Sequence, residues 1–106
     1  MTAGPSGEAS IPAPLEGTAV ERTVTIVNQK GLHARAAAKF VELAGKYQAE
    51  VEVLKDETSV SARSIMGLMM LAASPGVEIE LQGKGTEAQA AVDALAQLVL
   101  AKFHED

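Results

Sequence analysis

The chain has 106 residues, 47% of them hydrophobic, which is enough for one domain with a core of its own. It has no cysteine, which excludes disulfides and thiolate metal sites, and its two histidines lie far apart in the sequence, which argues against a histidine-based zinc site. The net charge of −5 argues against a nucleic-acid partner, and the absence of a long apolar run or a signal-peptide pattern predicts a cytoplasmic protein that is not associated with a membrane.

The first 19 residues differ in composition from the rest of the chain. They are rich in Pro, Gly, Ala and Ser and show no apolar period. Segments of this kind cannot bury enough apolar surface to order themselves. We therefore expect a flexible N-terminal extension over residues 1–19 and one folded domain over residues 20–106. A partner-binding arm is the alternative, and nothing in the sequence favours it.

The first predicted strand and helix are separated by a short loop. Thr23–Val27 is rich in β-branched residues and alternates, with Val24 and Ile26 on the same face. Gly31 allows a tight turn toward a helix predicted over Ala34–Gly45. The apolar face of this helix is expected to consist of Ala34, Ala37, Phe40, Val41 and Ala44.

A hairpin is predicted next. Glu50–Lys55 alternates cleanly, Asp56–Glu57 has turn composition, and Thr58–Val60 returns as the partner strand. Because Val51 and Val53 occupy alternate positions, they are expected to face the core.

A short and unusually apolar helix is predicted over Ile65–Leu71, with Ser64 as its N-cap. At 3.6 residues per turn its apolar side chains cannot all face one core, and Leu68 and Leu71 are the expected anchors. The remaining apolar side chains are expected to form an exposed patch, which usually marks a contact site. This patch consists of Ile65, Met66 and Met69.

The last strand is predicted over Val77–Gln82 by alternation, and the last helix begins at a predicted capping box, Thr86–Gln89. An apolar stripe continues along that helix, with Phe103 at its end, and residues 104–106 are predicted to be a polar tail. The resulting order β-α-β-β-α-β-α suits a four-stranded antiparallel sheet with one face covered by helices.

The stretch Gly31-Leu32-His33-Ala34-Arg35 places a histidine where the loop becomes the first helix. The first N–H groups of a helix have no partner within it and carry partial positive charge, so that they can hold an anion. Positive charge beside an imidazole favours its neutral, nucleophilic form. The pattern indicates attack of His33 on a phosphoryl group, with Arg35 binding the phosphate oxygens. A histidine that merely caps the helix is the alternative.

These residues resemble the active-site signature of HPr, the histidine-containing phosphocarrier of the bacterial phosphotransferase system. Residues Ser61–Leu68 are similar to the second signature of that family, around its regulatory serine, and the order of elements agrees over residues 22–103. Two signatures at the right separation are far more specific than either alone. The chain departs from the family at Ala36, where proline is usual.

The resemblance implies an α+β open-faced sandwich with strands in the spatial order 1-4-2-3 and three helices on one face. It implies a carrier rather than an enzyme with a small substrate of its own, and it implies no metal or other cofactor. Enzyme I would phosphorylate His33 on Nδ1, and His33 would pass the group to an Enzyme IIA-type acceptor domain. His33 and Arg35 would carry the transfer, and the phosphate would be held by His33, Ala34, Arg35 and Ala36.

The second signature implies that Ser64 is phosphorylated by an HPr kinase/phosphorylase. The alternative, which the sequence supports equally, is that Ser64 only caps the helix and has no regulatory role. The patch of Ile65, Met66 and Met69 would dock Enzyme I and the acceptor, and the protein is expected to be a monomer. Alanine at position 36 keeps the helix and restores an N–H donor, so we expect it to be neutral for transfer or to add a donor for the phosphate.

Two questions stay open from the sequence. The chain could be a regulatory binding module of the HPr type that does not transfer phosphate. If the chain is a carrier, these residues do not decide whether it takes part in sugar uptake or, as a nitrogen-type HPr paralogue, in a regulatory branch.

Overall fold

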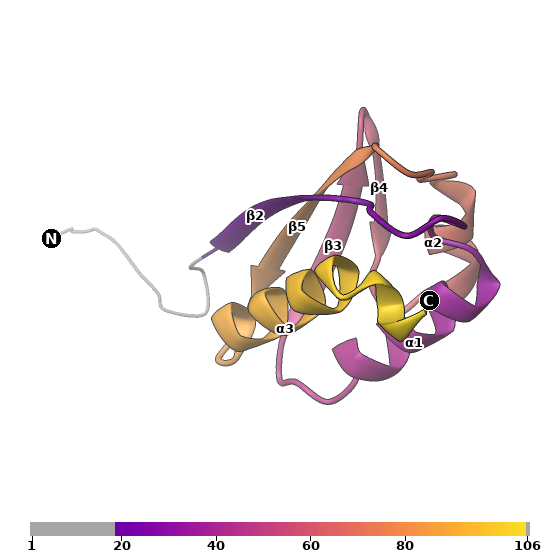
Figure 1. Ribbon diagram of the computed structural model, residues 1–106. Coiled ribbons are helices and arrows are strands. Elements are labelled where there is room, and N and C mark those ends of the chain that lie inside the picture. The colour runs from indigo at the N-terminus through magenta and orange to yellow at the C-terminus, as the bar shows by residue number, and fades with distance from the viewer. Residues whose placement is uncertain (1–18, 106) are drawn as a thin grey trace, which may run out of the picture.

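The computed structural model describes residues 19–105, and within them four strands form one antiparallel sheet (Figure 1). The strands are β2 (Ala19–Thr25), β3 (Glu50–Lys55), β4 (Thr58–Ser61) and β5 (Glu78–Lys84). They lie in the order β2-β5-β3-β4, with every neighbouring pair antiparallel. Numbered along the chain this order is 1-4-2-3, and the predicted fold is confirmed.

Three α-helices cover one face of this sheet (Figure 1). They are α1 (Ala34–Ala44), α2 (Ile65–Met70) and α3 (Ala88–Leu100), and α3 is followed by the short helix η2 (Lys102–His104). Figure 1 places the C-terminal end of the chain beside α1, although these two segments are far apart in the sequence. This arrangement brings the end of the chain close to the start of the first helix.

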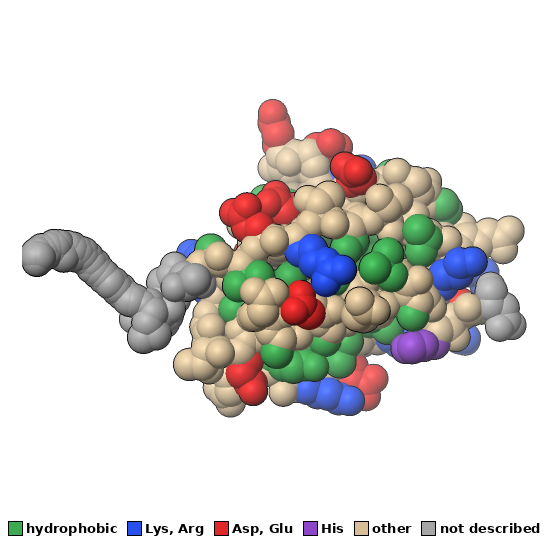
Figure 2. All heavy atoms as spheres, turned by 60° about the vertical axis from the view of Figure 1, so that its left-hand side comes forward, with side chains coloured by type: hydrophobic (Ala, Val, Ile, Leu, Met, Phe, Trp, Pro, Cys, Tyr) green, Lys and Arg blue, Asp and Glu red, His purple; other side chains and the backbone are tan. Residues whose placement is uncertain are grey.

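The core lies between the sheet and the helices, as strand alternation requires. Val53 and Leu81 point inward from neighbouring strands and are completely buried, as are Phe40 of α1 and Leu95 of α3. The intervening strand positions carry exposed glutamates on the other face of the sheet. In Figure 2, acidic side chains gather at the top of the molecule, where Figure 1 has the β3–β4 hairpin.

The first strand differs from its predicted bounds. It begins at Ala19 rather than Thr23 and ends at Thr25, because β5 offers paired positions back to Lys84. Ile26 still faces the core, and its N–H donates to the carbonyl of Val77 at 2.9 Å. Ala19 therefore belongs to the sheet, and the rest of the predicted extension, residues 1–18, lies outside the described residues.

Two local predictions for the helices are wrong. The capping box at Thr86 does not form, because the Thr86 hydroxyl donates to the carbonyl of Gln48 and the N-cap is Glu87 without a side-chain cap. The buried face of α1 is rotated from the expected one. Ala34 was expected to face the core but is exposed, whereas Ala36 is completely buried.

Candidate functional site

The backbone before α1 holds His33 in a defined place. Gly31 has a φ of +66°, and a Cβ there would come within 2.5 Å of the carbonyl oxygen of Ala73. The next residue, Leu32, is buried, and its N–H donates to that same carbonyl at 2.9 Å. His33 follows as the N-cap of α1 in an extended conformation, with φ −78° and ψ −179°. The turn at Gly31 thus fixes where the imidazole stands.

The start of α1 leaves its first N–H groups available. The first helical hydrogen bond runs from the N–H of Ala37 to the carbonyl of His33, at 2.8 Å. Within the described residues, the N–H groups of Ala34, Arg35 and Ala36 have no backbone partner, and the His33 side chain caps none of them. These groups form the positive end of the helix dipole. The structure thus brings together, in one turn, the four residues expected to hold a phosphate.

A hollow of about 710 Å³ opens beside this helix start. His33, Ala34 and Arg35 line it, together with Lys39 from the next turn of α1 and Lys30 from the preceding loop. Three cationic side chains therefore border the imidazole, although the protein as a whole is acidic. A local excess of positive charge next to a concave surface favours an anion such as a phosphoryl group.

The group in direct contact with the imidazole is an acidic one. Nε2 of His33 is hydrogen bonded to Oε2 of Glu105, and Oε1 of Glu105 accepts from Nδ2 of Asn28 at 3.1 Å. Burial by itself raises the pKa of the Glu105 carboxyl, but the hydrogen bonds from His33 and Asn28 outweigh it and hold the pKa below its usual range. The ammonium group of Lys39 acts in the same direction. Glu105 is therefore an ionised partner of His33 at neutral pH.

This contact differs from the expectation that residues 104–106 form a polar tail. Phe103 is completely buried, and its anchoring carries the following residues toward α1. The large aromatic side chain just beyond the last helix was the sequence signal that could have predicted an ordered C-terminal segment. The same turn corrects the expectation that His104 belongs to a polar tail, because His104 lines the hollow that contains His33.

In residues 19–105, no group of three or more His, Cys, Asp or Glu side chains is placed to hold a metal ion.

Ser64 stands at the start of α2 as predicted. Its Oγ accepts a hydrogen bond from the N–H of Gly67 at 2.9 Å, so that its role as an N-cap is confirmed. Leu68 and Leu71 are buried beneath the helix, as expected. The start of α2 is therefore closed by its own cap.

The predicted patch is exposed on α2. The exposed fractions are 40% for Ile65, 70% for Met66 and 41% for Met69. Met70, which the sequence analysis left out, is the most exposed at 77%, because α2 is only six residues long and its last turn has no cover. The helix α2 packs against α1, the helix that begins beside the His33 hollow.

Comparison with known proteins decides the family. The family model described as the "PTS HPr component phosphorylation site" matches residues 20–101. The chain belongs to the HPr family. Phosphocarrier protein NPr of Shewanella violacea is 50% identical over 88 residues, covering 83% of this chain and 97% of that protein. Phosphocarrier protein HPr of Cupriavidus necator is 44% identical over 86 residues, covering 81% of this chain and 97% of that protein.

Solved structures of HPr proteins have the same fold. The crystal structure of HPr-C-His from Thermoanaerobacter tengcongensis superposes with a TM-score of 0.78 at 42% identity, covering 82% of this chain and 98% of that one. HPr from Bacillus anthracis gives a TM-score of 0.74 at 38% identity, covering 76% of this chain and 96% of that one. This chain is thus a member of a family of non-catalytic phosphocarriers of the phosphotransferase system. No helix within residues 19–105 is long and apolar enough to cross a membrane.

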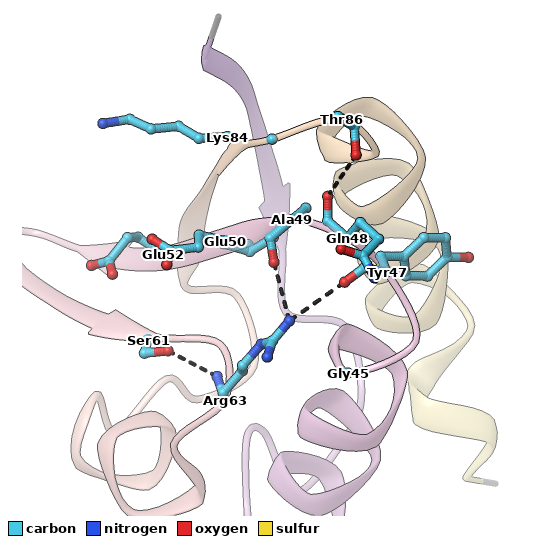
Figure 3. Close-up of a pocket in the computed structure, with 12 residues that line it drawn as sticks. Gly45, Tyr47, Gln48, Ala49, Glu50, Glu52, Ser61, Arg63, Lys84 and Thr86 are labelled. Atoms are coloured by element: carbon cyan, nitrogen blue, oxygen red, sulfur yellow. Dashed lines mark hydrogen bonds between the residues drawn. The ribbon is translucent and has the colours of Figure 1, made fainter. Parts of the chain in front are cut away.

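This HPr-family protein has a second hollow, of about 670 Å³, between the loop after α1, the start of β3 and the end of β5. Figure 3 shows Arg63 reaching across it to the carbonyls of Tyr47 and Ala49, at 3.4 and 3.3 Å. None of the predicted site residues lines this hollow. Arg63 therefore ties the segment before α2 to the loop after α1, while His33 and Arg35 lie at the other end of α1.

Proposed function

We propose that this protein is a phosphocarrier that accepts a phosphoryl group from phosphorylated Enzyme I on His33 and passes it to an Enzyme IIA-type acceptor. The observation that carries the proposal is the open start of α1, where an imidazole stands beside three N–H groups without a backbone partner. Arg35 and Lys39 line the hollow beside them. A phosphoryl group bonded to His33 could contact all of these donors at once.

The transfer step balances without a further reactant. The donor is an N-phosphorylated imidazole whose other ring nitrogen carries a proton. A lone pair of neutral His33 attacks phosphorus, the new N–P bond forms, and the donor nitrogen keeps the electron pair of the bond that breaks. The donor leaves as neutral imidazole, and His33 becomes a phosphorylated imidazolium. The reverse geometry serves transfer to the acceptor, so that a helix start of moderate affinity suits a carrier.

We further propose that Ile65, Met66 and Met69 dock both partners, and that Ser64 is a site of regulatory phosphorylation by an HPr kinase/phosphorylase. The exposed apolar area on α2 supports docking. A phosphate on Ser64 would stand at a helix start, where negative charge is favourable, yet beside apolar side chains that a partner must cover. The carrier would act as a cytoplasmic monomer.

The experiment is incubation of the full chain with Enzyme I and labelled phosphoenolpyruvate. Label that is acid-labile and base-stable, and that His33→Ala abolishes, is the result we expect. Absence of label in the wild-type chain, with another HPr labelled in parallel, would make this protein a non-transferring regulatory module. Transfer of the label to candidate Enzyme IIA domains then identifies the acceptor.

A further inference from the structure

The two ring nitrogens of His33 have different surroundings. Nε2 contacts the carboxylate of Glu105, whereas Nδ1 has no hydrogen-bonding partner within residues 19–105. We propose that Glu105 is a positioning residue that fixes the tautomer of His33 and so directs phosphoryl transfer to Nδ1. The inference rests on the proposed function of His33 as the phosphoryl acceptor.

The tautomer follows from what a carboxylate can do. An ionised carboxylate only accepts hydrogen bonds, so that its contact with Nε2 requires the proton of the neutral ring to be on that nitrogen. Nδ1 then carries the lone pair and is the nucleophile. The other tautomer would set the Nε2 lone pair against the oxygen of Glu105, which is repulsive. The contact thus selects one nitrogen for the chemistry.

Glu105 is itself held in orientation from the loop that precedes His33. Its other oxygen accepts from Nδ2 of Asn28 at 3.1 Å, and the same Nδ2 donates to the carbonyl of Gly31 at 2.8 Å. Asn28 is 1% exposed and cannot swing away. Each oxygen of the carboxylate therefore has its own donor, and one loop positions both members of the pair.

The backbone that presents Glu105 is strained. Lys102, Phe103 and His104 have φ values of 59°, 56° and 59°, and none of them is glycine. Such conformations persist only where the surroundings fix them. Here Phe103 is completely buried, and Nζ of Lys39 donates to its carbonyl at 2.7 Å. The buried Phe103 side chain and the hydrogen bond from Lys39 thus hold this turn against α1, with Glu105 in contact with the imidazole.

The charge of Glu105 also suits the product. When Nδ1 bonds to phosphorus, Nε2 keeps its proton and the ring becomes positively charged. The carboxylate already in contact with Nε2 stabilises that charge without moving. Glu105 acts through His33 and does not touch the phosphoryl group.

The test compares Glu105→Ala and Glu105→Gln with the wild-type chain, and uses Glu57→Ala in the exposed β3–β4 turn as the matched charge control. Long-range proton–nitrogen NMR spectra, recorded where the ring is neutral, report the tautomer of His33. Rapid-mixing transfer from phosphorylated Enzyme I reports the rate. Glu105→Gln retains one acceptor oxygen for two donors, so that it should preserve part of the effect, and it serves if the alanine variant does not fold.

We expect the wild-type ring to be protonated on Nε2, the alanine variant to show mixed tautomers, and the glutamine variant to lie between them. The rate of transfer should fall by about tenfold in Glu105→Ala, as expected for the loss of one charge-assisted hydrogen bond. It should remain unchanged in Glu57→Ala. An unaltered tautomer, or equal slowing by both alanine variants, would overturn the proposal. The NMR readout needs no phosphoryl transfer, so a chain that Enzyme I cannot phosphorylate defeats the proposed function and leaves the tautomer assignment separately testable.

Discussion

Two helix starts in this protein, those of α1 and α2, are similar in construction and differ in what their N–H groups contact. At α2, the Ser64 hydroxyl accepts from the N–H of Gly67 and the positive end of the helix is partly satisfied. At α1, the His33 side chain turns to Glu105 instead, and the first three N–H groups have no backbone partner in the described chain.

The surroundings of the two starts differ in the same sense. Lysine and arginine side chains border His33, whereas exposed apolar side chains of α2 adjoin Ser64. A capped helix start is suited to stability, because its donors are already used. An uncapped start with cations around it is suited to holding an anion that arrives and leaves. The comparison predicts that substitutions at α1 change transfer, while those at α2 change stability and docking.

The largest expected effect is that of Arg35→Ala. Losing the charge-assisted hydrogen bonds to phosphate should slow transfer by about 10- to 100-fold. Arg22→Ala is the control, since it removes the same charge at an ion pair with Asp93 on α3. Rapid-mixing measurements of transfer from Enzyme I provide the rates. Equal slowing by both variants would mean that only net charge matters.

Next in size is the effect of Met66→Asp on docking. A charge in the centre of the exposed α2 patch should weaken the binding of Enzyme I by about tenfold, as for a desolvated interface residue. Leu100→Asp is the control, because Leu100 is also exposed, at 46%, but lies on α3. Calorimetric titration measures both affinities. Retained binding in Met66→Asp would place the docking surface elsewhere.

Substitution of the α2 cap should affect stability. Ser64→Ala removes the acceptor for the Gly67 N–H and should lower the free energy of unfolding by about 1 kcal/mol. Ser64→Asp retains a capping oxygen, so its stability should stay close to that of the wild type while its negative charge weakens docking. Urea denaturation and the same titration separate the two effects. A Ser64→Ala variant of unchanged stability would show that the cap contributes little.

The pair of His33 and Glu105 predicts a dependence of stability on pH. The pKa of the Glu105 carboxyl is lowered in the folded protein, so its contribution to stability is present above the unfolded pKa and is lost as the pH falls through the folded value. The difference in unfolding free energy between the wild type and Glu105→Gln should therefore shrink on acidification. Denaturation at a series of acidic pH values measures it. A difference in unfolding free energy that does not change with pH would mean that ionisation of the Glu105 carboxyl does not contribute to stability.

The smallest effect is expected for Ala36→Pro. The N–H of Ala36 precedes the first helical hydrogen bond, so proline removes no backbone bond there. It removes one of the three N–H donors beside the imidazole and leaves the other two, so the transfer rate should be equal to that of the wild type or slightly lower. A much faster variant would contradict the view that alanine is neutral at this position.

Much of this molecule could be predicted from the sequence. Alternation identified the strands, and the crowding of apolar residues in a short helix identified Met66 and its neighbours as exposed. The strand order followed from the family resemblance. The contact of Glu105 with His33 could not be predicted from periodicity, because it depends on a left-handed turn that has no repeating pattern. The box at Thr86 failed for a related reason, since a tertiary acceptor, the carbonyl of Gln48, competes for the hydroxyl.

The most direct test of the account is a phosphorus NMR spectrum of the full chain, labelled with nitrogen-15 in histidine and incubated with Enzyme I and phosphoenolpyruvate. We predict one phosphoramidate signal, coupled to Nδ1 of His33 and absent from His33→Ala. A phosphoryl group on any other residue, or no nitrogen-coupled signal while a known HPr gives one, would contradict it.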